Sequence, residues 1–384
     1  MNILMVEPSY LAKFPPLGLM KYSSWHKSKG DDVDFFKGMK PNRKDYDIIY
    51  ITTLFSWHSP LVIETIKYYQ TNYTAEIKVG GIFATLMPDY IEQKTGIRPV
   101  CGYSKELDEL LPDYELAKKK SKFDDYSYVF TTRSCPNNCK FCAVKKLDGN
   151  FWVNSKWKAQ VDLTKPKINI FDNNIVIAPI EHFIDVIQFT IDNDLIIRFE
   201  GGIDFRFVTK EHAIWLSKAN IEYEYIRLAF DDIKADGKFQ PKVKMMMANG
   251  VKGTDMSVYV LCNFTDNVEE SHYRCREIVK LGIRPIPLFF MPLDHTDMRG
   301  EVRMNANWTP DLITNFRHFY TRGGLWRKLD FYTWIKDPNR KTYVNKEIPL
   351  VLDFDPDKTS KYFRENKDEV YMGKDSLNLA DFRA

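Results

Sequence analysis

The sequence lacks the marks of a membrane protein, a disulfide-stabilised domain and a chain of one dominant charge. No apolar run approaches the roughly 20 residues of a membrane-spanning helix, and Met1 leads directly into a strand pattern instead of a signal peptide. Six cysteines in 384 residues are too few for a disulfide scaffold. The 55 Lys and Arg nearly balance the 52 Asp and Glu, which argues neither for nor against a nucleic-acid partner. We therefore expect a cytoplasmic globular protein without a membrane partner.

Apolar residues make up 44% of the chain, enough for a sizeable core and for two or three domains. The first ~110 residues alternate β-rich runs with helical patterns, which predicts an α/β fold with a doubly wound (Rossmann-like) parallel sheet. The expected strands cover 2–6, 33–36, 47–53, 76–79 and 99–102, and the expected helices cover 19–29 and 61–69. This pattern predicts a first domain over residues 1–120.

Strands and helices alternate again after a polar stretch that ends near residue 125. The expected strands cover 126–132, 168–171, 196–200, 225–229, 258–261 and 286–290, with helices such as 180–193 and 268–281 between them. Six such repeats predict a partial (β/α)6 barrel over residues 121–299. The remaining residues, 300–384, lose this rhythm and are expected to form a mixed C-terminal extension.

Three cysteines lie within eight positions directly after the strand expected over 126–132. Cys135, Cys139 and Cys142 give the spacing C-x3-C-x2-C on one loop. Thiolates are soft ligands that suit an iron–sulfur cluster or zinc, and short spacings let one loop surround a single metal centre. A cubane cluster held by three cysteines leaves one iron open for another ligand.

A zinc site is the alternative for the same loop. It would need a fourth ligand, either a distant His or one of Cys101, Cys262 and Cys275. Zinc sites usually combine two short ligand pairs, and the sequence contains no second pair of that kind. Cys262 and Cys275 are expected to be small buried residues.

The cysteine loop resembles the signature of the radical S-adenosylmethionine (SAM) superfamily, including an aromatic residue, here Phe141, directly before the last cysteine. The resemblance covers roughly residues 121–295. It implies that Cys135, Cys139 and Cys142 hold a [4Fe-4S] cluster whose open iron chelates SAM, with Phe141 beside the cofactor. It also implies reductive cleavage of SAM to methionine and a 5′-deoxyadenosyl radical, which abstracts hydrogen from a substrate.

The resemblance further implies that SAM contacts lie at the carboxyl ends of successive barrel strands. After the strand over 168–171 the family often has Gly-Gly-Glu, whereas this chain has Asp172, Asn173 and Asn174. We expect Asp172 and Asn173 to contact the cofactor.

The next strand ends in a charged segment with two glycines, Gly201 and Gly202, that permit close backbone approach. Arg206 is expected to bind the SAM carboxylate through its guanidinium fork. Glu200 and Asp204 are expected to bind the ribose or the substrate. An ordinary surface ion pair is the alternative interpretation of these charges.

The N-terminal sheet, with Pro15-Pro16-Leu17-Gly18 after its first strand, resembles the cobalamin-binding-type (B12-binding-like) domain of one branch of the superfamily. The Asp-x-His-x-x-Gly element that often supplies an axial histidine is absent. Gly80-Gly81 would let a corrin or nucleotide tail approach the backbone but also suits a common turn, and His58 is interpreted as a solvated loop residue. Cobalamin binding and a purely scaffolding sheet both stay open.

The C-terminal extension contains a basic stretch interleaved with aromatic residues between Phe316 and Lys346. Its eight cations are Lys or Arg at 317, 322, 327, 328, 336, 340, 341 and 346. Such a stretch can follow phosphates while its rings stack on bases, or it can cover a core with its aromatics while the cations are solvated. We favour the covering layer, in which Gly323-Gly324 would hinge a substrate cap.

These features together favour an enzyme that uses SAM radical chemistry on an unreactive C–H position, by methylation if cobalamin binds. A reductant such as flavodoxin or ferredoxin is the expected partner, and the substrate is a small molecule, a peptide or a nucleic acid. A modifier of nucleic-acid bases or peptides is one alternative. A non-catalytic zinc module that docks on nucleic acid is the alternative from a different class.

Overall fold

The structure is a computed structural model that describes residues 1–41, 44–117, 123–293, 295–296, 307–321, 324–327 and 329–337. These residues divide into two compact units. The first contains Met1–Gly201 and the described residues between 292 and 302, and the second contains Gly202–Met291 and the described residues after 302. In the described ranges, no helix has both the length and the apolar character needed to cross a bilayer.

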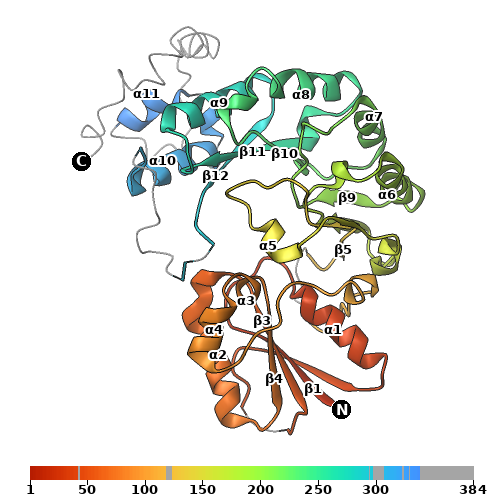
Figure 1. The fold of residues 1–384 in the computed structure, drawn as a ribbon. Coiled ribbons are helices and arrows are strands. Elements are labelled where there is room, and N and C mark those ends of the chain that lie inside the picture. Colours follow the sequence, from red (N-terminus) through yellow and green to blue (C-terminus); the bar gives the residue numbers. More distant parts are fainter. Residues whose placement is uncertain are drawn as a thin grey trace. The chain divides into compact units, whose positions relative to one another are not determined.

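The first unit begins with a four-stranded parallel sheet in the order β2-β1-β3-β4 (Figure 1). Its strands are β1 (Asn2–Glu7), β2 (Asp32–Lys37), β3 (Ile48–Thr53) and β4 (Glu76–Gly81). The helices around it are α1 (Leu17–Lys27), α2 (Ser59–Asn72), α3 (Ile82–Leu86) and α4 (Pro88–Thr95), with a 3-10 turn η1 (Ser56–His58) before α2.

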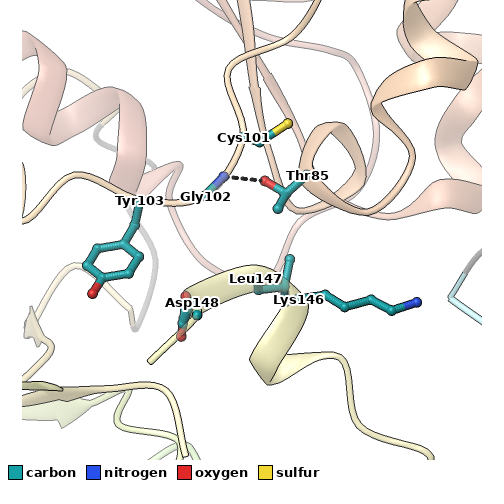
Figure 2. A pocket seen from close by; sticks show the side chains of 8 residues that line it. Thr85, Cys101, Gly102, Tyr103, Lys146, Leu147 and Asp148 are labelled. Atoms are coloured by element: carbon teal, nitrogen blue, oxygen red, sulfur yellow. Dashed lines mark hydrogen bonds between the residues drawn. The ribbon is translucent and has the colours of Figure 1, made fainter. Parts of the chain in front are cut away.

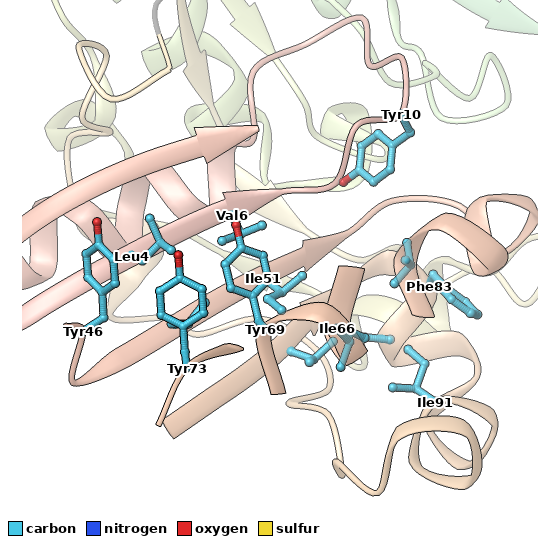
Figure 3. Packing of buried hydrophobic residues seen from close by; sticks show 14 residues of the cluster. Leu4, Val6, Tyr10, Tyr46, Ile51, Ile66, Tyr69, Tyr73, Phe83 and Ile91 are labelled. Carbon is cyan, nitrogen blue, oxygen red and sulfur yellow. The ribbon is translucent and has the colours of Figure 1, made fainter. Parts of the chain in front are cut away.

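Alternation along β1 explains why helices cover both faces of this sheet. Leu4 and Val6 pack with residues of α2, α3 and α4 in one core cluster (Figure 3), while Ile3 and Met5 pack with Leu19 of α1 in another. Successive strand side chains point to opposite faces, so a strand that is apolar at every position must be covered on both sides. The predicted doubly wound sheet is confirmed.

The first unit continues with a second parallel sheet, β5-β8-β9, whose carboxyl ends carry the cysteine loop. Its strands are β5 (Tyr126–Val129), β8 (Lys167–Ile170) and β9 (Ile196–Phe199). A short antiparallel ribbon joins β6 (Thr132–Arg133) to β7 (Trp152–Val153). The helical segments are η2 (Leu107–Glu109), α5 (Val144–Asp148), η3 (Trp157–Gln160), η4 (Ile175–Ile177) and α6 (Ile180–Asp192).

The second unit contains a third parallel sheet in the order β10-β11-β12. Its strands are β10 (Ile226–Ala229), β11 (Met256–Cys262) and β12 (Arg284–Phe289). Its helical segments are α7 (Lys210–Lys218), η5 (Ile233–Ala235), α8 (Phe239–Ala248), η6 (Gly253–Asp255), α9 (Val268–Lys280), α10 (Pro310–Thr321), η7 (Leu325–Arg327) and α11 (Phe331–Lys336). Asn267 and Glu270 form a capping box that fixes the start of α9.

The fold class predicted from the sequence is confirmed, because each expected repeat strand from 126 onward has a counterpart in a parallel sheet. Two local expectations were wrong. The run 99–102 makes only a single parallel bridge, between Val100 and Gly80, because Pro99 cannot donate to a ladder. The strand expected over 126–132 ends at Val129, because the backbone N–H and C=O of Phe130 both bond to the Gln160 side chain. The predicted domain boundaries near 120 and 300 stay predictions.

The described part of the C-terminal segment is consistent with the covering layer. Phe316, Phe319 and Phe331 are buried, whereas Arg317, Arg327 and Lys336 are exposed. Long basic side chains on such helices keep their charge in water while the rings fill the core. The other predicted cations (Arg322, Lys328, Arg340, Lys341 and Lys346) and Gly323 lie outside the described residues.

Candidate functional site

The cysteine loop is the connection between the two strands of the β6–β7 ribbon, directly after β5. The side chains of Cys135 and Cys139 are half-buried and that of Cys142 is exposed, so all three thiols lie at or near the surface. The backbone N–H of Cys142 donates to the carbonyl of Cys139 at 3.0 Å, which closes a turn inside the motif. Phe141 is half-buried within the same turn. The loop thus presents the three predicted ligands from one short, accessible segment.

The ends of this loop are held together by a buried serine. Ser134 has a φ of 66°, a left-handed conformation that is uncommon outside glycine. Its hydroxyl donates to the carbonyl of Gly149 at 2.6 Å. The residue directly before Cys135 is therefore fixed to the residue that ends α5, and a strained backbone at this point is typical of a functional loop.

A buried charge cluster anchors the base of the ribbon, and the sequence analysis did not identify it. Asp108 of η2 accepts from Arg133 Nη2 at 2.8 Å and from Lys21 Nζ of α1 at 2.7 Å, and both Lys21 and Asp108 are only 3% exposed. Burial would raise the pKa of Asp108, but Arg133 and Lys21 outweigh it and lower the pKa. Burial lowers the pKa of Lys21 to about 8. Removing one partner of such a cluster leaves uncompensated buried charge.

The segment after β8 contacts both sides of the cysteine loop. Asp172 is buried and accepts from the backbone N–H of Thr131 at 2.6 Å and from the Thr131 hydroxyl. Asn173 donates to Asp148 of α5 at 2.9 Å. Asn174 is buried, and its amide nitrogen lies 3.9 Å from the sulfur of Cys135. Asp172 and Asn173, predicted to contact the cofactor, thus hold the residue before β6 and the helix after the cysteine motif.

Burial also sets the ionisation of Asp172. It raises the pKa of this carboxyl to about 6, although hydrogen bonds from Thr131 oppose the shift. His182 of α6 places Nε2 3.1 Å from the Thr131 hydroxyl, which extends the network away from the loop. Burial lowers the pKa of His182, so its imidazole is neutral near pH 7 and can donate only one N–H.

Close packing at the carboxyl end of β9 accounts for a glycine at position 201, so no bound ligand is needed to explain it. A side-chain carbon at Gly201 would lie 1.9 Å from the carbonyl oxygen of Asp172, so only glycine fits where these two strand ends meet. Glu200 is paired with the buried Arg198, whose Nε donates at 2.8 Å, and with Lys13 at 3.1 Å. Its side chain is 15% exposed.

In the second unit, Asp204 and Arg206 form a bidentate ion pair. Arg206 Nε lies 2.8 and 3.1 Å from the two Asp204 oxygens, and the Arg206 side chain is 57% exposed. This geometry is that of an exposed ion pair in which the guanidinium fork is occupied by a carboxylate of the same segment. Their assignment to SAM therefore stays a prediction.

The cysteines outside the loop lie in a different environment. Cys262 and Cys275 are fully buried in the second unit, as expected. Burial raises the pKa of Cys262 to about 12 and that of Cys275 well above its usual value. Cys101 is exposed. Among the described residues no group of three or more His, Cys, Asp or Glu lies close enough together to hold a metal ion. The predicted cluster ligands are therefore not gathered in this structure, and neither are the ligands of a zinc site.

The N-terminal sheet presents two polar atoms without partners where β3 ends. Ser56 is buried with its hydroxyl unbonded, and Nδ1 of His58 is buried without a hydrogen bond. The His58 ring stacks on Tyr10 with ring centres 4.8 Å apart, and burial lowers the pKa of His58. The expected solvated loop residue is thus half-buried. Gly81 has a φ of 114° and passes so close to Thr53 that a side-chain carbon would lie 2.3 Å from its carbonyl oxygen.

A shallow cavity of about 350 Å³ lies in the first unit between α5 and the residues that follow β4 (Figure 2). Its lining residues are Thr85, Cys101, Gly102, Tyr103, Lys146, Leu147, Asp148 and Gly149. The N–H of Gly102 donates to the Thr85 hydroxyl at 2.9 Å. The helix after the cysteine motif is thus in contact with the N-terminal sheet region through α3.

No protein-family model and no curated protein matches this sequence. Solved structures do match. One is the radical SAM methyltransferase TsrM from Kitasatospora setae with cobalamin and a [4Fe-4S] cluster bound, at 11% identity and a TM-score of 0.60 over 75% of this chain and 74% of that one. Another is the same enzyme with tryptophan substrate and a SAM analogue, at 12% identity and a TM-score of 0.56 over 76% and 73%. The chain therefore shares the mixed α/β fold of a cobalamin-binding radical SAM methyltransferase.

Proposed function

We propose that this protein is a radical SAM enzyme in which Cys135, Cys139 and Cys142 hold a [4Fe-4S] cluster. The observation that carries the proposal is the position of the three-thiol loop, directly after β5, in a fold shared with an enzyme whose structure contains such a cluster. A fold by itself does not define a function. The fold and the ligand spacing together support this function over a zinc module.

The donor set suits an iron–sulfur cluster chemically. Three thiolates from one loop supply the soft ligands that iron–sulfur clusters need, and binding would draw the three sulfurs together from their present positions. The Asn174 amide next to Cys135 is placed to donate to a ligating sulfur, a contact that tunes such clusters. When bound, the cluster supplies the electron that cleaves SAM. Ser134 and the Asp108 cluster hold the loop in place, which is the contribution of the protein.

For SAM itself we propose the contacts expected from the sequence. Asp172 and Asn173 would orient the cofactor beside Phe141, through the backbone they hold in place. Glu200, charge-compensated by Arg198 and Lys13, would accept from ribose hydroxyls. In the second unit, Arg206 would bind the SAM carboxylate, and Asp204 would bind ribose or substrate once Arg206 is engaged.

Cobalamin-dependent methylation of an unreactive carbon is the reaction subtype that we propose. The support is the N-terminal sheet and the cobalamin bound in the TsrM structure. The unbonded hydroxyl of Ser56 and the unbonded Nδ1 of His58 lie where β3 ends, at the edge of open α/β sheets where ligands bind. A buried polar atom without a partner is costly unless a ligand or water satisfies it. When bound, cobalamin supplies the methyl carrier.

Oxygen-free purification followed by reconstitution with iron and sulfide tests both parts of this proposal. We expect a brown protein that, after reduction, converts SAM to 5′-deoxyadenosine or transfers its methyl group. We also expect it to retain cobalamin on a desalting column, with a corrin absorption spectrum. A colourless zinc protein that leaves SAM intact would refute the enzyme assignment. A brown, active protein that retains no cobalamin would refute only the methylation subtype.

A further inference from the structure

The surface beside the cysteine loop carries four exposed lysines, which we call the lysine face: Lys105, Lys140, Lys145 and Lys146. Lys140 lies between two of the cysteines, and Lys145 and Lys146 belong to α5, directly after the third. Figure 2 shows the Lys146 side chain extended away from α5 at the rim of the cavity. The stretch from Arg133 to Leu147 contains four basic residues and no acidic one. Positive charge thus surrounds the accessible edge of the loop.

Ring contacts connect Lys105 to the same surface. Its ammonium lies 5.1 Å from the centre of the Trp152 ring, and Trp152 stacks on Tyr103, which lines the cavity with Lys146. Trp152 is paired with Arg133 at the base of the cysteine ribbon. Lys105 and Lys146 thus lie beside residues that line the cavity, and Lys140 and Lys145 lie on the cysteine loop and on α5.

No carboxylate of the described residues neutralises the lysine face. None of the four lysines has an ion pair there, and in this they resemble Lys67 and Lys94 of the same described unit, whereas Lys13 and Lys27 each pair with a carboxylate. Asp148, the acid closest along the chain, is engaged by Asn173 and by Arg133 at 3.6 Å. Glu106, next to Lys105, is the exposed acid on this side. The face therefore has an uncompensated positive charge available to a partner.

We infer that the lysine face is the docking surface for an acidic one-electron carrier protein, an inference that rests on the proposed function. The carrier must approach the exposed side of the cluster loop, and Cys142 is its most exposed cysteine. Electron-transfer complexes bury small interfaces and rely on charge complementarity for fast encounter. In each encounter one electron passes from a reduced flavin or iron–sulfur centre of the carrier to the cluster, and an anionic flavin hydroquinone becomes the neutral semiquinone without losing a proton.

A protein carrier fits this surface better than a nucleic acid does. Four lysines would neutralise few phosphates, and the salt-dependent affinity of nucleic-acid binders grows with the number of phosphates contacted. The net charge of the whole chain is only +3. The rings at the face are stacked on each other instead of being presented singly to bases.

The test is a binding titration with a fluorescently labelled, acidic flavodoxin and the reconstituted enzyme, followed by anisotropy. The variant Lys145→Glu/Lys146→Glu reverses two charges of the face. The matched control, Lys67→Glu/Lys94→Glu, makes the same charge change on the exposed lysines of α2 and α4. Thermal melts confirm that both variants are folded.

We expect binding to the unaltered enzyme to weaken steeply between about 50 and 300 mM salt, because surface charges are screened over a Debye length. The face variant should bind at least about tenfold more weakly, and the control should change by less than about twofold. Flavodoxin-driven SAM cleavage should fall in parallel, while cleavage driven by dithionite, which needs no docking, should stay within about twofold.

Equal flavodoxin binding by both variants, or no binding by the unaltered enzyme at low salt, would overturn the docking surface. Loss of binding to a single-stranded RNA oligonucleotide, with flavodoxin binding intact, would assign the face to nucleic acid and also overturn it. Failure of dithionite to cleave SAM in the unaltered enzyme refutes the proposed function instead, and the titration then still decides whether the face binds the carrier protein.

Discussion

The cysteine loop of the first unit and the cysteine-containing core of the second unit place the same side chain in opposite environments. Cys135, Cys139 and Cys142 lie at or near the surface on a loop whose ends are fixed. Cys262 and Cys275 are fully buried, with pKa values raised by desolvation. The thiolate is the form that binds metal. Accessibility to metal, more than residue type, therefore separates candidate ligands from core cysteines.

The two regions also use buried charge differently. Asp108 joins η2 to the cysteine ribbon through Arg133 and to α1 through Lys21. In the second unit, Asp266 bonds to the fully buried Arg274 at 2.8 Å, and Arg274 also donates to the carbonyls of Phe230 and Leu261. The first cluster therefore supports an accessible loop, whereas the second closes on its own strand ends and stabilises only its unit.

The largest effect is expected from removing one cysteine from each of the two environments. Cys139→Ala removes a proposed ligand and should reduce iron from about four per chain to below about one, with complete loss of SAM cleavage. Cys275→Ala removes a buried sulfur and should cost about 1–2 kcal/mol of unfolding free energy with iron retained. Iron analysis and quantification of 5′-deoxyadenosine measure the loss of cluster and activity, and denaturant titration measures the change in unfolding free energy. Retention of iron by Cys139→Ala would contradict the assignment of the accessible loop cysteines as cluster ligands.

Thiol labelling of the metal-free protein tests the difference in accessibility between loop and core cysteines without any assay of activity. Cys135, Cys139 and Cys142 should react with iodoacetamide at least about a hundredfold faster than Cys262 and Cys275, because buried thiols react only through opening of the fold. Mass spectrometry of peptides at timed intervals gives the rates. In denaturant the five rates should converge, and unequal rates there would show that local sequence, and not burial, is the cause.

Removing the buried acid of each unit should separate loop support from general stability. Asp108→Ala and Asp266→Ala should each lower the unfolding free energy by about 3–5 kcal/mol, since each leaves one buried cation, Lys21 or Arg274, without a carboxylate. Only Asp108→Ala should also lower the iron content of the folded protein. Glu109→Ala, in the same turn as Asp108, removes an exposed pair with Lys156 and should cost below about 1 kcal/mol. Denaturant titrations measure the unfolding free energy, and iron analysis measures cluster retention. Equal iron loss in both aspartate variants would contradict a specific role of Asp108 in supporting the cysteine loop.

The smallest effect is a pH dependence centred on Asp172. Its pKa is about 6 in the fold and about 4 in an unfolded chain, so the folded state binds more protons between these values. The stability contribution is therefore fully present below about pH 4 and is lost as the pH rises through 6, by at most ~3 kcal/mol. Burial also raises the pKa of Asp231 to about 6, so Asp172→Asn should reduce the slope of the unfolding free energy between pH 4 and 6 and leave the part due to Asp231. The double variant Asp172→Asn/Asp231→Asn should reduce it further. An unchanged slope in Asp172→Asn would assign the titration to another group.

Much of the fold was predictable because the patterns that encode it are local. Each repeat strand from 126 onward was found within a few residues of its expected position, since runs such as Ile168–Phe171 are apolar and bounded by polar loops. The two failures came from side chains elsewhere in the chain or from a missing donor. Gln160 captured the backbone of Phe130, and Pro99 lacked the N–H that a ladder needs.

The sequence by itself determined the alternating α/β order, the three clustered thiols and the residues that follow each strand, because spacing along the chain carries that information. Only the tertiary structure decided that Asp172 and Asn173 brace the loop, and that Asp108 lies between Lys21 and Arg133. Those contacts join positions up to 87 residues apart. Burial and charge compensation of that kind depend on which surfaces meet when the strands and helices pack.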